Sequence, residues 1–122
     1  MSYILIVIAV LVVVFVFSRL RGNTPSLEAV QTDLDNGALL IDVRSSAEFS
    51  GGHAKGAKNI SLQSIQSGTL PSQDKQKTIY IYCHSGARAS RASSILRRSG
   101  FNKVVNLGGL SKWRSMGGAV TK

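Results

Sequence analysis

The feature that most restricts how this chain can fold is an uncharged apolar run near its N-terminus. The run reads YILIVIAVLVVVFVF over residues 3–17, contains no Gly or Pro, and is extended to eighteen residues by Met1, Ser2 and Ser18. As a helix, eighteen residues rise about 27 Å, close to the thickness of the hydrocarbon core of a bilayer. The run therefore predicts a transmembrane anchor over residues 1–18.

A cleaved signal peptide is the alternative interpretation of the same run. Signal peptides carry an apolar region of about 7 to 15 residues behind a positively charged start. Here no Lys or Arg precedes the run, and no small-x-small cleavage site follows Phe17, so we favour an uncleaved anchor. Because Arg19 and Arg21 come directly after the run, the positive-inside tendency predicts a single-pass membrane protein whose C-terminal domain faces the cytoplasm.

The rest of the chain has the length and pattern of one α/β domain. Removing the first 18 of 122 residues leaves 104, which is enough for a single domain with its own core. We expect a linker over residues 19–25 and a domain over residues 26–122. Short β-branched runs alternate there with helix-like segments, and this alternation is typical of a mainly parallel sheet.

The expected elements follow from local signals. Thr24 and Pro25 are suited to the N-cap and first position of a helix that Asn36 and Gly37 end, and polar loops are expected from Ser45 to Lys58. The other expected segments are a strand over 38–44, a strand over 79–82, a helix over 89–99, a strand over 104–107 and a short helix containing Trp113.

The charge balance indicates anionic partners. The chain has 15 Lys plus Arg against 6 Asp plus Glu, a formal charge of +9, and no acidic residue follows Asp74. Such a field favours small oxyanions, phospholipid headgroups or nucleic acid. We expect no nucleic acid as a partner, because the basic residues are scattered and no aromatic-rich stacking surface accompanies them.

Cys83 is the only cysteine, which excludes an internal disulfide and a multi-cysteine metal site. It is either inert core filler or a reactive thiol. It stands at the end of a predicted strand, where parallel sheets collect their reactive groups, and a Gly-containing loop follows it. This position favours the reactive thiol, and we expect neither a metal ion nor a cofactor.

The loop after Cys83 has the features of a site for an anion and a thiolate. Gly86 lets the backbone curl so that successive N–H groups point inward, and the helix that follows adds its positive end. Arg88 can fold back and hold an oxyanion with two parallel hydrogen bonds, although it could also be a solvated residue at a helix start. We expect His84 to lie at the surface or to contact the substrate, and not to act as a general base. The expected substrate-binding residues are His84, Ser85, Gly86, Ala87, Arg88 and Ala89.

A set of short motifs, in this order along the chain, resembles the rhodanese homology domain. The resemblance covers roughly residues 24 to 120. The motifs are Asp42-Val43-Arg44, Glu48-Phe49, Gly52-His53, Gly56-Ala57, Asn59-Ile60, Tyr82-Cys83-x-x-Gly86-x-Arg88, Gly100-Phe101, Leu107-Gly108-Gly109 and Trp113. This resemblance implies a five-stranded parallel sheet with helices on both faces. It also implies transfer of sulfane sulfur from a small anionic donor such as thiosulfate, through a persulfide on Cys83, to a thiol or cyanide-like acceptor.

Loop length separates two activities found on this fold. Related cell-cycle phosphatases place one more residue between cysteine and arginine than the four found here, His84 to Ala87. By this analogy the shorter loop favours an enzyme that transfers sulfur. An enzyme that acts on arsenate or on a phosphate ester stays a competing hypothesis. The chain departs from the family pattern at Ala54 and over residues 116–119, both away from the loop.

Two further expectations concern the surroundings of the loop and the kind of activity. Asp42, Arg44, Glu48 and His53 are expected to form a structural network of hydrogen bonds and ion pairs beside the site, since transfer of sulfur needs no acid-base pair. A ping-pong displacement through Cys83 is the expected mechanism. The alternative is a carrier or binding module that holds a persulfide for a membrane partner without turnover of its own.

Overall fold

The fold is described from a computed structural model, which covers residues 2–20 and 24–122; for residues 18–20 only the helical backbone is described. Four parallel strands form the central sheet, in the order β3-β1-β4-β5. Their bounds are Leu39–Asp42 for β1, Lys58–Asn59 for β3, Ile79–Cys83 for β4 and Val104–Gly109 for β5. The prediction of an α/β domain with a parallel sheet is confirmed.

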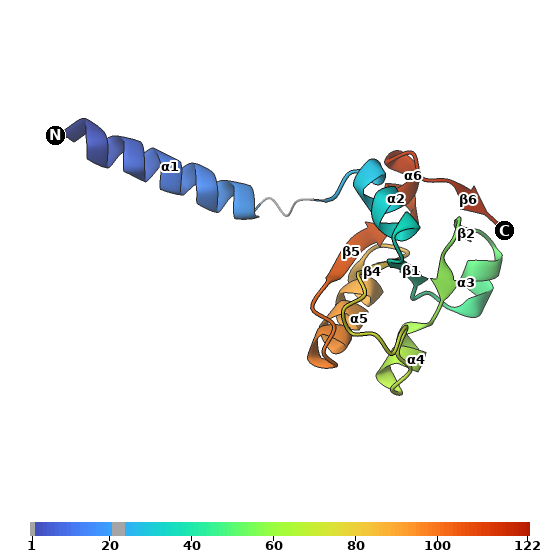
Figure 1. Cartoon of the computed structure of the whole chain (residues 1–122). Helices are drawn as coiled ribbons and strands as arrows, with labels where there is room; N and C mark the ends of the chain where they lie inside the picture. The colour runs from blue at the N-terminus through green and yellow to red at the C-terminus, as the bar shows by residue number, and fades with distance from the viewer. Residues whose placement is uncertain (1, 21–23) are drawn as a thin grey trace.

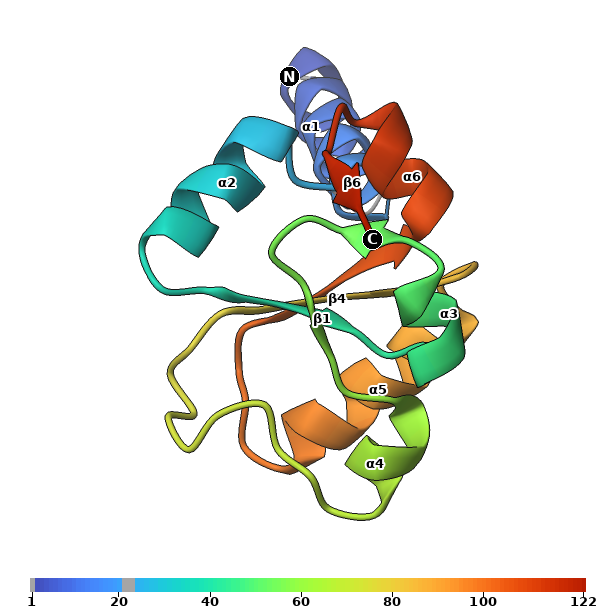
Figure 2. The ribbon, with the colours of Figure 1, turned by 90° about the vertical axis from the view of Figure 1, so that its right-hand side faces the viewer.

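Helices cover both faces of this sheet, as Figure 2 shows with the strands running across the middle of the view. On one face lie α2 and α6, and on the other lie α4 and α5. The helices are α1 (Ser2–Leu20), α2 (Leu27–Asp35), α3 (Ser46–Ser50), α4 (Leu62–Gln66), α5 (Ala87–Arg98) and α6 (Leu110–Ser115). In Figure 1 the first of these, α1, lies apart from the other elements.

The two faces of the sheet bury different side chains because successive residues of a strand point to opposite sides. On β4, Ile79, Ile81 and Cys83 pack with α5, whereas Tyr80 and Tyr82 pack on the other face with Val30 of α2 and Trp113 of α6. All five residues of β4 are buried. Such a continuous apolar strand is what a sheet with two covered faces requires.

The resemblance implied five strands in the sheet, and this is wrong: the described residues place four there. The remaining two strands, β2 (His53–Ala54) and β6 (Val120–Thr121), pair antiparallel with each other in a separate ribbon. Strand β2 does not join the central sheet because it pairs with β6 instead. In addition, the N–H of Ala54 donates to the hydroxyl of Tyr82 at 3.0 Å.

The helix starts differ from the sequence prediction at two places. The N-cap of α2 is Ser26, whose hydroxyl accepts from the amide of Ala29, and not Thr24. Residues 45 to 58 are not all loop, because Ser45 and Glu48 form a capping box that starts α3. Of the linker predicted over residues 19–25, positions 21–23 lie outside the described residues.

The apolar N-terminal run forms helix α1, but within residues 2–20 and 24–122 no helix meets the length and hydropathy that crossing a bilayer requires. Within α1 the continuous run of apolar side chains, without the flanking Ser2 and Ser18, covers only the fifteen residues 3–17. Fifteen helical residues rise about 22 Å, which is shorter than a hydrocarbon core of about 30 Å. The predicted anchor over residues 1–18, and the single-pass topology with a cytoplasmic domain that depended on it, are therefore not supported.

Candidate active site

Cys83 ends β4 at the carboxyl edge of the sheet, on the face that α5 covers. The residue is only 1% exposed. Its sulfur is nevertheless not surrounded by apolar groups alone, because the backbone N–H of Gly86 donates to Sγ at 2.9 Å. A hydrogen bond from an amide favours the negatively charged form of a sulfur over the neutral form. The arrangement thus combines burial with one polar contact aimed at the sulfur.

The loop between β4 and α5 makes its turn at Gly86. This residue has φ +101°, in the left-handed region that suits glycine, and it is the N-cap of α5. Since glycine has no capping side chain, no side chain satisfies the amides of the first turn of α5. His84, Ser85 and Ala87 are exposed, whereas Ala89 is buried. The start of a twelve-residue helix is therefore open to an anion beside the sulfur.

Strand β5 supports this loop from behind, a role that the sequence analysis missed. Asn106 Nδ2 donates to the carbonyl of Gly86 at 3.1 Å, and Asn106 Oδ1 accepts from the amide of Gly108 at 2.7 Å. A Cβ on Gly109 would overlap the backbone carbonyl of His84. The glycine pair after Leu107 was visible in the sequence, but its closeness to the loop depends on the pairing of Cys83 with Gly109 between β4 and β5.

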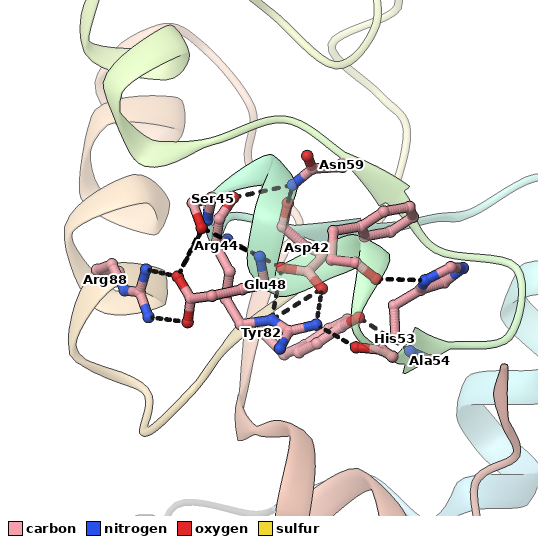
Figure 3. A network of polar contacts seen from close by, with 11 residues as sticks. Asp42, Arg44, Ser45, Glu48, His53, Ala54, Asn59, Tyr82 and Arg88 are labelled. Carbon is pink, nitrogen blue, oxygen red and sulfur yellow. Dashed lines mark hydrogen bonds and ion pairs between the residues drawn. The ribbon is translucent and has the colours of Figure 1, made fainter. Parts of the chain in front are cut away.

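The side chain of Arg88 binds a carboxylate of the protein. The sequence analysis had expected it to fold back over the Cys83 loop and hold an oxyanion. Its two terminal nitrogens donate to the two carboxylate oxygens of Glu48 at 2.7 and 3.0 Å, as the left side of Figure 3 shows. Glu48 is itself fixed, since Oε1 also accepts from the amide and the hydroxyl of Ser45. The hydrogen bonds from Arg88 lower the pKa of Glu48 to about 2, and Glu48 in turn raises the pKa of Arg88.

A second ion pair lies deeper, next to the same edge of the sheet. Arg44 Nη2 and Nε donate to Asp42 Oδ2 at 2.7 and 3.0 Å, and Arg44 Nη2 also donates to the carbonyl of Gly52 at 2.7 Å. The side chains are 7% and 0% exposed. Asn59 Nδ2 donates to the carbonyls of Asp42 and Arg44 at 3.0 and 2.9 Å (Figure 3).

The network expected from Asp42, Arg44, Glu48 and His53 is therefore divided into separate parts. Asp42 binds Arg44, Glu48 binds Arg88, and His53 contacts neither pair. Its Nδ1 lies 2.9 Å from the carbonyl of Phe49, and its ring stacks on the Phe49 ring with centroids 3.6 Å apart. Among residues 2–20 and 24–122, no group of three or more His, Cys, Asp or Glu side chains could hold a metal ion.

Tyr82 joins the buried pair to the rest of the site. Its hydroxyl accepts from Ala54 N–H, and the guanidinium carbon of Arg44 lies 5.8 Å from the centre of its ring. Burial and the neighbouring Asp42 raise the pKa of Tyr82, so the phenol stays neutral. The strand that carries Cys83 is thus tied to the Asp42–Arg44 pair by the residue immediately before the sulfur.

Several relatives resemble the chain over most of the domain. Protein YqhL of Bacillus subtilis, described as uncharacterized, is 42% identical over 77 residues, which are 62% of this chain and 60% of that protein. A putative sulfur carrier protein YrkF of the same organism is 33% identical over 72% of this chain and 49% of its own length. The chain thus spans less than two thirds of both proteins.

An enzyme and a solved structure add to this set. Thiosulfate sulfurtransferase PspE of Escherichia coli is 35% identical over 57% of this chain and 68% of that enzyme. The crystal structure of the Rhodanese_3 like domain of the Anabaena protein Alr3790 superposes with a TM-score of 0.64 at 30% identity, covering 70% of this chain and all of that domain. The model of the rhodanese-like domain family matches residues 26–116, from the cap of α2 to the end of α6. With this match over most of its length, the chain belongs to the rhodanese-like domain family.

Proposed function

We propose that this protein is a sulfurtransferase that carries sulfane sulfur on Cys83 as a persulfide. The observation that carries the proposal is the amide of Gly86, which lies 2.9 Å from Sγ at the start of α5. A thiolate and a persulfide are both anions, and an N–H group together with the positive end of a helix stabilises both. The relation to a thiosulfate sulfurtransferase supports thiosulfate as the type of donor.

The proposed reaction has two balanced displacements. The Cys83 thiolate attacks the outer sulfur of thiosulfate, the sulfur–sulfur bond of the donor breaks, and its electron pair leaves with sulfite. The product is a Cys83 persulfide anion. An acceptor such as cyanide or a thiolate then attacks the terminal sulfur, and the electron pair of the persulfide bond returns to Cys83 as the thiolate. No external oxidant, metal or cofactor enters either step.

Two groups are available to bind the anionic donor. The first-turn amides of α5 form one, because no side chain caps them. Arg88 is the other: its bidentate contact with Glu48 uses one hydrogen of each terminal nitrogen, which leaves the Nε edge of the guanidinium for a second anion. In this proposal Glu48 holds Arg88 in place and also competes with the donor for its charge.

The test is sulfur transfer to Cys83 in the full chain. We expect the wild type to gain the mass of one sulfur atom after thiosulfate, to lose it after a reductant, and to form thiocyanate when cyanide is added. Cys83→Ser should gain no sulfur atom and form no thiocyanate, while keeping the unfolding midpoint of the wild type. Ser99→Ala, which changes an exposed hydroxyl at the other end of α5, serves as the control. Undiminished thiocyanate formation by Cys83→Ser would refute the proposal.

A persulfide carrier without turnover on small molecules is the second candidate. The burial of Cys83 favours it, because a residue 1% exposed protects a bound sulfur from solvent while hindering small donors. The relation to the putative sulfur carrier YrkF also supports it. A carrier would acquire sulfur from a persulfidated protein much faster than from thiosulfate, and intact-mass kinetics with both donors separates the two functions.

A further inference from the structure

A polar groove of about 360 Å³ lies between α4 and α5 on the face of the sheet that contains Cys83. The two helices lie next to each other in the lower half of Figure 2. One residue of α4 and five residues of α5 line the groove: Gln66, Ser90, Arg91, Ser94, Ile95 and Arg98. Its lining therefore contains two cations, one amide, two hydroxyls and one apolar side chain, and no carboxylate.

The two guanidinium groups of the groove have hydrogen-bond donors that the described residues do not use. Arg91 has no side-chain partner among them, and Arg98 uses only its Nε, in a long contact of 3.4 Å to the carbonyl of Ser94. Arg97 differs, because its Nη2 donates to the carbonyl of Val104 at 2.9 Å. With no acidic residue after Asp74 in the sequence, the groove attracts negative charge.

The spacing of the two cations suits a protein segment better than a single small ion. Arg91 and Arg98 are seven residues apart on one helix, which corresponds to about 10 Å along its axis. An extended peptide advances about 3.3 Å per residue and points every second side chain to the same face, so carboxylates four residues apart lie on one face about 13 Å from each other, within reach of the two long arginine side chains. Ile95, between the two arginines, offers an apolar contact to a residue between the two carboxylates.

The groove begins where the loop of the site ends. Ser90, at one end of the lining, donates its amide to the carbonyl of Gly86, whose own amide contacts the Cys83 sulfur. A segment bound along α5 would therefore hold its protein next to the loop that carries the sulfur. We propose that this groove docks an acidic segment of the protein that exchanges sulfur with Cys83. The identity of the partner as a sulfur-exchange protein rests on the proposed function, whereas the preference of the groove for an acidic segment does not.

The experiment uses a fluorescent peptide containing Glu-Ser-Val-Ser-Glu and the full chain. We expect anisotropy to show salt-sensitive binding that weakens about fivefold in Arg91→Ser/Arg98→Ser, since each exposed ion pair contributes roughly 0.5 kcal/mol. Lys103→Ser/Arg114→Ser removes the same charge from exposed positions outside the groove and should change binding less than twofold. A peptide with Gln in place of Glu should bind to none of these proteins.

Three outcomes would overturn the docking surface: equal loss of peptide binding in both double variants, undiminished binding in Arg91→Ser/Arg98→Ser, or tighter binding of an oligonucleotide of equal charge. Thiocyanate formation from thiosulfate, measured on the same proteins, should be equal in the wild type and both double variants. If the peptide binds as expected but no variant transfers sulfur, the groove remains and the proposed function fails. If sulfur transfer is normal but the arginines do not affect the peptide, only the docking surface fails.

Discussion

The two ion pairs beside the Cys83 loop differ in burial and in their connection to the loop. Arg44 and Asp42 are adjacent in space and nearly adjacent in sequence, with side chains 7% and 0% exposed. Arg88 and Glu48 come from α5 and α3, forty residues apart, with side chains 37% and 36% exposed. The first pair lies at the carboxyl end of β1. The second pair joins α5, the helix after Cys83, to the short helix α3.

This difference predicts different roles for the two pairs. A buried pair holds the fold because removing one partner leaves an uncompensated charge in the interior. A half-exposed pair contributes little to folding, and its charges stay available to a ligand. The pKa of Arg88 is raised mainly by the hydrogen bonds that it donates to Glu48, and Cys83 is among the weaker electrostatic causes.

The largest expected effect is on stability and comes from the buried pair. Arg44→Met leaves Asp42 without its partner and should lower the free energy of unfolding by about 3–5 kcal/mol. Arg88→Met, the same change in the half-exposed pair, should lower it by less than about 1 kcal/mol. Urea unfolding of the two variants and the wild type measures both. Equal losses would show that the two pairs do not differ as their burial indicates.

Sulfur transfer should give the opposite order for the two arginines. If Arg88 binds the donor, Arg88→Met should reduce kcat/KM for thiosulfate by about 100-fold, the usual loss when one donor to a reacting anion is removed. Arg88→Lys keeps the charge but not the two-pronged geometry, and it should recover part of the loss. Thiocyanate formation measures the rates. An unchanged kcat/KM in Arg88→Met would remove Arg88 from the site.

Glu48→Gln tests whether the carboxylate competes with the donor. Glutamine keeps an oxygen for Ser45 and Arg88 but removes the negative charge, so repulsion of the donor decreases. We expect the KM for thiosulfate to fall about threefold, with kcat unchanged, because an exposed pair contributes roughly 0.2–1 kcal/mol. A higher KM would mean that holding Arg88 in place matters more than the competition.

The smallest effect is the acid dependence of the Glu48 contact. The pKa of Glu48 is lowered from 4.5 to about 2 in the folded protein, mainly by Arg88. Its contribution to stability is thus complete above pH 4.5 and is lost as the pH falls from there to about 2. The difference in urea midpoint between wild type and Glu48→Gln should shrink over this range. A difference that is constant with pH would contradict the ion pair.

The elements with strong local signals could be predicted from the sequence. The apolar strand over 79–82 and the helix over 89–99 were both expected, and they are found as β4 (Ile79–Cys83) and α5 (Ala87–Arg98). Helices α3 and α4, with five residues each, are too short for a periodic apolar pattern. Only the Ser45-x-x-Glu48 capping box could have indicated α3.

The contacts of the site were harder to predict than its residues. Cys83 and Gly86 are three residues apart, so their contact follows from the turn itself. Glu48 meets Arg88 only because α3 packs near the start of α5, and no local pattern contains that information. The same holds for Asn106, whose side chain reaches Gly86 across twenty residues of sequence.

The burial of the single cysteine makes the protein a reporter of its own loop. Because Cys83 is only 1% exposed, the folded protein should be alkylated more slowly than the unfolded chain, and slowest by the bulkiest reagents. Comparing the rate of iodoacetamide labelling at Cys83 with the rate in unfolding urea would measure how far the loop limits access to the sulfur. The chain contains no other thiol to interfere with this measurement.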